Sequence, residues 1–158
     1  MTWTSVNASS AEACGLMPDE YDAIIAAVDS EATPGLTVLT RCASQLCAHI
    51  QGALAAGGAM PLGPEDTLPP GVLRSFTALL RRDVVACIPQ LGETLMKGDR
   101  RQLALEAEAH LKRLETNAKG YSYSPDEPAA EQPNSQAGGE LITGLNTTLR
   151  SRTRRVLG

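Results

Sequence analysis

Apolar residues recur at helical spacing along most of the first 120 residues of the chain. The clearest stripe advances in steps of three, four, three, four and three residues: Leu36, Leu39, Ala43, Leu46, Ile50 and Ala53. Steps of this size keep side chains on one face of an α-helix. The pattern therefore predicts a long helix over residues 35–56, ended by Gly57-Gly58 because glycine accepts the backbone conformations of helix C-termini.

Two further amphipathic segments follow a stretch rich in glycine and proline, residues 57–71, which cannot be helix interior. The first is predicted to begin near Gly71 or Val72 and to stop before Pro89. Its expected buried face comprises Val72, Phe76, Leu79, Leu80, Val84 and Cys87. The second is predicted to run from Asp99, which can cap it, to about Lys119. Its inward face is expected to hold Leu103, Ala107, Leu111 and Leu114.

The N-terminal 35 residues predict two shorter helices. Ser9 and Glu12 have the spacing of a capping box, so a helix is expected to start after Ser9. Gly15 must end that helix soon afterwards. Pro18 suits the first turn of the next helix, which the sequence at residues 33–35, Thr-Pro-Gly, is expected to end.

The composition changes after residue 120. Residues 121–139 hold Pro, Gly, Ser, Glu, Gln and Asn with almost nothing apolar to bury, so this linker is not expected to order by itself. Apolar residues then return just before a basic end. The predicted partner-binding residues are Leu141, Ile142, Leu145, Leu149, Arg150, Arg152, Arg154 and Arg155. The predicted domains are a helical bundle (1–120), a linker (121–139) and a docking arm (140–158).

Aromatic residues make up only 3% of the chain, which favours closely packed helices over a sheet. Together with the periodicities, this predicts an all-α fold: a small helical bundle of about four to five helices with an extended C-terminal arm. No stretch approaches the roughly 20 apolar residues of a membrane span, and no membrane association is expected. The N-terminus lacks the basic and apolar regions of a signal peptide.

The formal net charge of −4 conceals an uneven distribution. Residues 1–66 carry eight acids and one base, a net −7, and residues 67–119 carry nine bases and six acids, a net +3. The remaining residues carry four of each, with all four bases in the last nine positions. One acidic and one basic region suit head-to-tail contact between copies or an oriented partner surface. Chance scatter over a solvated surface is the alternative.

No sequence motif announces an enzyme, a metal site or a cofactor site, so no catalytic residue, metal ligand or cofactor is expected. Asp19, Glu20 and Asp22 resemble a metal cluster, but acids are also favoured at a helix start by its dipole. Glu106 and His110 are four residues apart on a predicted helix, which indicates a surface contact. The four cysteines show no CxxC spacing and are expected to be free thiols in a reducing compartment.

Paired bases on the predicted helices, such as Arg81-Arg82 and Arg100-Arg101, could meet phosphates or simply face solvent. The apolar residues of the arm argue against a tail whose purpose is solubility alone. Burying four such side chains would contribute on the order of 6 kcal/mol before ordering costs, at about 25 cal/mol per Å² of apolar area. That is enough to dock the arm on a neighbouring molecule.

Several segments in order resemble a known family. A helix ends in Cys47-Ala48-His49-Ile50-Gln51-Gly52-Ala53-Leu54-Ala55-Ala56-Gly57-Gly58, and Met60-Pro61-Leu62 follows it. Then come Leu68-Pro69-Pro70-Gly71-Val72-Leu73, an arginine-bearing helix, Ile88-Pro89, and Asp99-Arg100-Arg101 opening a helix rich in Ala and Glu. Over residues 9–120 this is similar to the small head–tail connector (adaptor, or head-completion) proteins of Mu-like and lambda-like tailed bacteriophages. Family members often carry an aromatic residue before the Pro-Leu turn, which this chain lacks.

The resemblance implies a structural, non-enzymatic neck protein of the virion, assembled in the host cytoplasm. It implies a homo-oligomeric ring that docks on the portal protein, meets the next neck or tail protein and extends the DNA channel. Contact between the basic tip and packaged DNA remains open. A DNA-binding packaging or regulatory protein, similar to a small terminase subunit, is the alternative function.

Overall fold

The computed structural model describes residues 1–125, so the predicted arm and most of the predicted linker lie outside it. Within this range six α-helices occur: α1 (Ala11–Cys14), α2 (Pro18–Ala26), α3 (Gly35–Ala56), α4 (Leu73–Cys87), α5 (Gly92–Leu95) and α6 (Arg100–Thr116). Single 3-10 turns lie at η1 (Pro70–Val72), η2 (Pro89–Leu91) and η3 (Lys119–Tyr121). The short strands β1 (Thr4–Ser5) and β2 (Thr67–Leu68) pair antiparallel. The all-α prediction is confirmed for the described residues.

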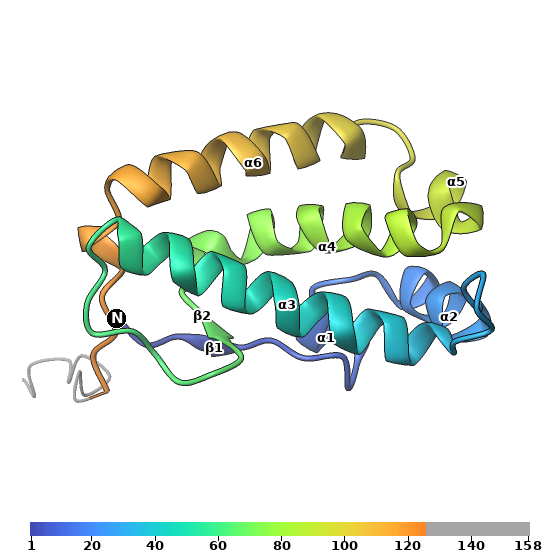
Figure 1. The fold of residues 1–158 in the computed structure, drawn as a ribbon, viewed down its shortest axis with the longest axis horizontal. Helices are drawn as coiled ribbons and strands as arrows, with labels where there is room; N and C mark the ends of the chain where they lie inside the picture. Colours follow the sequence, from blue (N-terminus) through green and yellow to red (C-terminus); the bar gives the residue numbers. More distant parts are fainter. Residues whose placement is uncertain (126–158) are drawn as a thin grey trace, which may run out of the picture. The chain divides into compact units, whose positions relative to one another are not determined.

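The three long helices α3, α4 and α6 pack against one another, with α4 in the middle (Figure 1). The helix α2 packs against α3, while β1 and β2 lie beside the other half of α3. Phe76 on α4 is the largest fully buried side chain, and leucines and isoleucines from α2, α3 and α4 fill the space around it. No helix among residues 1–125 has both the length and the apolar character needed to cross a membrane.

The predicted apolar faces of the long helices are largely confirmed. Every residue of the α3 stripe is buried except Leu36, which is 42% exposed, so the prediction for Leu36 was wrong. The buried face of α3 is wider than one stripe because two layers cover it, α2 with the N-terminal segment on one side and α4 with α6 on the other. It also includes Val38, Cys42, Cys47 and Leu54. Among the residues predicted to be buried on the other two long helices, only Cys87 at the end of α4 and Leu103 on α6 are half-exposed.

The helix starts differ from the capping predicted by the sequence. Ser10, not Ser9, caps α1, and its hydroxyl oxygen accepts a hydrogen bond from the N–H of Ala13 at 3.2 Å. Ser9 is not the cap because its hydroxyl hydrogen-bonds to Asn7 instead. The predicted capping box at Ser9 was therefore wrong. The helix α2 ends at Ala26, well before residue 33, because a turn that leads into α3 follows it.

Two glycines allow helices to approach more closely than any other residue would permit. A β-carbon on Gly35, at the start of α3, would lie 1.7 Å from the carbonyl oxygen of Ile24 in α2. A β-carbon on Gly57, after α3, would lie 1.8 Å from the carbonyl oxygen of Leu114 in α6. At both of its ends, α3 is therefore in direct contact with the backbone of a neighbouring helix.

The chain beyond α6 packs back onto the start of the protein. Trp3 donates an indole hydrogen bond to the carbonyl oxygen of Tyr121 at 3.0 Å, and its ring meets Tyr123 edge to face, 6.0 Å between centroids. The N–H of Tyr123 donates to the carbonyl oxygen of Pro61 at 2.8 Å. The compact unit consequently runs from Met1 to Pro125, five residues past the boundary expected from composition.

Candidate functional site

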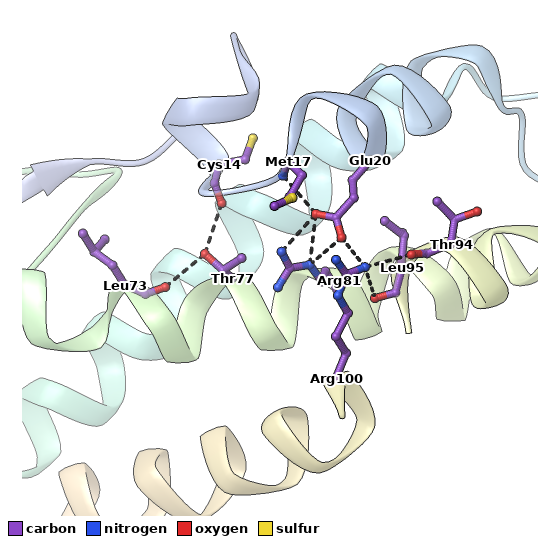
Figure 2. Close-up of polar contacts among 9 residues, drawn as sticks. All are labelled: Cys14, Met17, Glu20, Leu73, Thr77, Arg81, Thr94, Leu95 and Arg100. Carbon is purple, nitrogen blue, oxygen red and sulfur yellow. Dashed lines mark hydrogen bonds and ion pairs between the residues drawn. The ribbon is translucent and has the colours of Figure 1, made fainter. Parts of the chain in front are cut away.

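A buried carboxylate joins three parts of the bundle. Glu20 lies in the first turn of α2, and its side chain is only 1% exposed (Figure 2). The Arg81 guanidinium of α4 donates to this carboxylate through Nε and Nη2, with the Nη2 to Oε2 distance at 2.9 Å. The Arg100 guanidinium, at the start of α6, forms a second ion pair with Oε1. We call these three residues the Glu20 cluster.

The cluster also satisfies backbone groups that helix ends leave open. Glu20 accepts a hydrogen bond from the N–H of Met17 at 2.9 Å, which covers one of the free donors at the start of α2. Arg100 donates to the carbonyl oxygens of Thr94 and Leu95 in α5, at 2.8 and 3.4 Å. A carboxylate removed from water needs such charged and polar partners to remain ionised. The cluster therefore ties α2, α4, α5 and α6 together.

The position of Glu20 bears on the two interpretations of the acids at the start of α2, which were a metal cluster or acids favoured by the helix dipole. Asp19 and Asp22 are exposed while Glu20 points inward, so the three acids do not converge. No group of three or more His, Cys, Asp or Glu side chains among the described residues could hold a metal ion. The paired bases separate in the same way: Arg81 and Arg100 turn inward toward Glu20.

A groove of about 430 Å³ lies next to the cluster, between α4 and α6. Arg74, Ser75 and Arg81 line one side of it and Glu106 and His110 line the other. The Ser75 hydroxyl and His110 Nδ1 lie 2.7 Å apart; the hydroxyl donates when the imidazole carries its proton on Nε2, and it accepts when the proton is on Nδ1. Among the described residues no hydrogen bond joins His110 to Glu106, although both line this groove; the Glu106 carboxylate accepts from Gln102 Nε2 at 3.3 Å.

Ser75 and His110 are the residue types of a catalytic nucleophile and its general base. An activated serine needs an imidazole oriented by a third group and N–H donors facing the developing oxyanion. Within residues 1–125, Nε2 of His110 has no hydrogen-bond partner. What the contact does in this structure is join α4 to α6 at a largely buried serine, which is 8% exposed.

A second groove of about 410 Å³ lies on another side of α4, between α3 and α6. Arg82 spans part of it, forming ion pairs with Asp83 and with Glu108. These hydrogen-bonded partners raise the pKa of Arg82 against a desolvation effect that lowers it. The side chains of this group are between 33% and 47% exposed, so each ion pair contributes little to stability.

The four thiols are free, as predicted. Burial raises the pKa of Cys14 and of Cys47 to about 11. Burial also raises the pKa of Cys42 to about 12, with a further contribution from the neighbouring thiol of Cys87. Thiols with such pKa values are almost entirely protonated near neutral pH and react slowly.

The eight predicted partner-binding residues, from Leu141 to Arg155, all lie outside the described residues. The class that the described residues define is a small all-helical bundle with a buried ion cluster and two open grooves. No family model, curated protein sequence or solved structure matches the chain. Functional assignment therefore depends on the residues themselves.

Proposed function

We propose that this chain is a structural neck protein of a tailed bacteriophage: a ring-forming head–tail adaptor whose C-terminal arm docks on the portal. The short segments that resemble the connector family support this, because each lies at an element boundary. Residues 47–58 form the end of α3, residues 68–73 span β2, η1 and the start of α4, and Asp99 precedes α6. The resemblance implies this same order along the chain: the end of a long helix, a Pro-Leu turn, the start of a second helix and the start of a final helix.

The observation that carries the proposal is the attachment of the chain after α6. Contacts with Trp3 and with Pro61 hold Tyr121 and Tyr123 in place. In Figure 1 the chain after α6 passes close to the N-terminus. Residues 1–125 form a compact unit, and 33 residues, 126–158, follow it in the chain. They include the apolar and basic residues from Leu141 to Arg155. A scaffold with an attached docking segment suits an adaptor between two larger assemblies.

Truncation after Pro125 tests the proposal better than truncation after Gly120, because it retains the Tyr121 and Tyr123 contacts. The truncated chain should unfold at the same temperature as the full chain. In co-sedimentation with portal rings from the same phage, its affinity should fall at least about tenfold, since the docking side chains are gone. Equal portal binding by the truncated and full chains would exclude a role for the arm.

A full-length control separates docking from mere length. Replacing Leu141, Ile142, Leu145 and Leu149 by serine keeps the arm at its natural length and charge. This variant should bind portals as poorly as the truncated chain.

The DNA-binding alternative makes a different prediction about the terminal arginines. Replacing Arg150, Arg152, Arg154 and Arg155 by alanine should abolish binding to duplex DNA if phosphate contact is the function. That binding should also weaken steeply as salt is raised. If the full chain binds duplex DNA in this way and does not bind portals, the packaging or regulatory function replaces the adaptor.

A further inference from the structure

Three large apolar side chains are exposed together where α2 meets α3. Ile25, Val28 and Leu36 are 43%, 52% and 42% exposed. The backbone brings their positions together: Val28 forms a β-bridge with Pro34, the N–H of Gly35 donates to the carbonyl oxygen of Ala27 at 2.9 Å, and Ile25 and Leu36 adjoin this pairing in the sequence. We call Ile25, Val28 and Leu36 the apolar corner. Grouped exposed side chains of this kind on a soluble domain commonly mark an interaction surface.

The surroundings of the apolar corner are acidic. Asp22 lies one helical turn before Ile25 on the solvent face of α2, and Glu31 is exposed in the turn that follows. Neither carboxylate forms an ion pair among residues 1–125. Asp29 accepts hydrogen bonds from N–H groups of its own turn, and Arg41 acts on it electrostatically. Arg41 offsets part of the negative charge of Asp22, Asp29 and Glu31. The residues around the apolar corner therefore keep a net negative charge.

A second surface, on α6, has the complementary character. Leu105 faces outward from α6 and is 61% exposed, while the buried face of the same helix holds Ala104, Ala107 and Leu111. Arg101 and Lys112 lie one turn before and about two turns after Leu105 on the same side of the helix, and Lys112 also lines the α3–α6 groove. Neither base forms an ion pair within the described part of the chain. We call Arg101, Leu105 and Lys112 the α6 stripe.

The exposed Glu115 lies beside Lys112 at the α3–α6 groove, which leaves the stripe with one net positive charge, and the acidic Glu108 lines the same groove. Its carboxylate is paired with Arg82 of α4, which offsets its charge. Figure 1 shows α6 along the top of the bundle and the α2–α3 junction at its lower right-hand end, below α4. The two surfaces are therefore on different sides of one protomer and cannot meet within it.

We propose that the apolar corner of one copy packs against the α6 stripe of the next copy. The inference deepens the proposed adaptor function, because it names the contact between ring subunits. If the apolar corners of two copies packed against each other, their acidic residues would meet. If the α6 stripes of two copies packed against each other, their basic residues would meet. Only the unlike pairing matches charge with opposite charge while burying Ile25, Val28 and Leu36 against Leu105. A contact between two different surfaces repeats from copy to copy and closes into a ring when the rotation allows.

Charge reversal on the full-length chain tests the pairing. The corner variant is Asp22→Lys with Glu31→Lys, and the stripe variant is Arg101→Glu with Lys112→Glu. Each variant alone has two surfaces of like charge. In sedimentation velocity over a range of protein concentrations, each should self-associate at least about tenfold more weakly than the natural chain.

An equimolar mixture of the two variants provides the decisive measurement. Basic surfaces of the corner variant then face acidic surfaces of the stripe variant at both contacts, so alternating copies can associate. Association in the mixture should return to within about threefold of the natural chain. Recovery in the mixture also shows that both variants are folded. A self-contact of one surface, or general loss of structure, would not be repaired in this way.

Matched controls lie outside both surfaces. Met60→Ser removes another highly exposed apolar side chain, 63% exposed, and Arg74→Glu reverses an exposed charge in the α4–α6 groove. Neither should change association. The inference is wrong if the natural chain shows no self-association, or if the mixture associates no better than its components. Portals are absent from this assay, so the adaptor proposal can fail on portal binding while this pairing stands, and the reverse also holds.

Discussion

Replacing Glu20 by glutamine probes the buried ion cluster with almost no change in side-chain size. In the natural chain the carboxylate accepts hydrogen bonds from Met17 and Arg81 and forms an ion pair with Arg100 (Figure 2). Glutamine retains one carbonyl oxygen but presents an NH2 group in place of the other oxygen. That donor faces guanidinium donors, so both the charge and part of the hydrogen bonding are lost.

The magnitude follows from the burial of the three side chains. Glu20 is 1% exposed, whereas Arg81 and Arg100 are 14% and 27% exposed and can recover some water. Removing one partner of a buried ion pair costs about 3–5 kcal/mol. Because the arginines are not fully buried, the lower end applies, about 3 kcal/mol. With a urea m-value of about 2 kcal/mol/M, the unfolding midpoint should fall by about 1.5 M.

Urea unfolding followed by far-UV circular dichroism measures this loss. Asp83→Asn is the control, because it breaks an exposed ion pair whose side chains are 40% and 33% exposed, and it should cost less than about 1 kcal/mol. Replacing Glu20, Arg81 and Arg100 together by methionine should recover most of the lost stability, since no charge is then left buried alone. A cost below about 1 kcal/mol for Glu20→Gln would show that the cluster is not the buried anchor described above.

Two other predictions concern close packing and thiol chemistry. Gly57→Ala should lower the free energy of unfolding by more than about 2 kcal/mol, because the added β-carbon meets the backbone of α6. Gly52→Ala should raise the free energy of unfolding by about 0.5–1 kcal/mol, because Gly52 lies within α3 and has open space around it. Equal thermal shifts for the two variants would contradict the close approach. In the native protein, half-exposed Cys87 should react first with a disulfide reagent, and Cys14 and Cys42 should react slowly, with rates that rise as pH approaches their pKa values of about 11 and 12. Peptide mapping that finds all three modified together would refute this order.

The sequence predicted the long helices well because their apolar residues follow a 3.6-residue period, which tertiary contacts reinforce. It failed at Leu36 because periodicity reports the face of a helix and not where its neighbour ends. Gly35, in the first turn of α3, contacts α2, but the next side chain, Leu36, is 42% exposed although it continues the stripe. The cap of α1 was misplaced by one residue for a similar reason: Ser9 and Ser10 are both capable of capping, and the contact of Ser9 with Asn7 decides between them.

The candidate sites were harder to predict because they join residues that are distant in the sequence. Glu20 and Arg81 are 61 positions apart, and nothing in either local pattern indicates that they meet. One signal was available: Arg81 and Arg82 are adjacent, and neighbouring helical positions point about 100° apart. The two arginines therefore point in different directions, and they can meet different partners. The pairing of Ser75 with His110 depends on the same long-range arrangement, between α4 and α6.

The Glu20 cluster and the proposed assembly surfaces are connected through the geometry of α2. The apolar corner is built on α2 and the first turn of α3, whereas the α6 stripe is on the helix that begins with Arg100. The cluster is therefore the polar connection between the elements that carry the two surfaces. A ring closes only if each protomer holds its two surfaces at one angle. Glu20→Gln protein that remains folded at low temperature should consequently associate more weakly than the natural chain, although neither surface has changed. Unaltered association at full native circular dichroism would show that α3 and α4 alone maintain that angle.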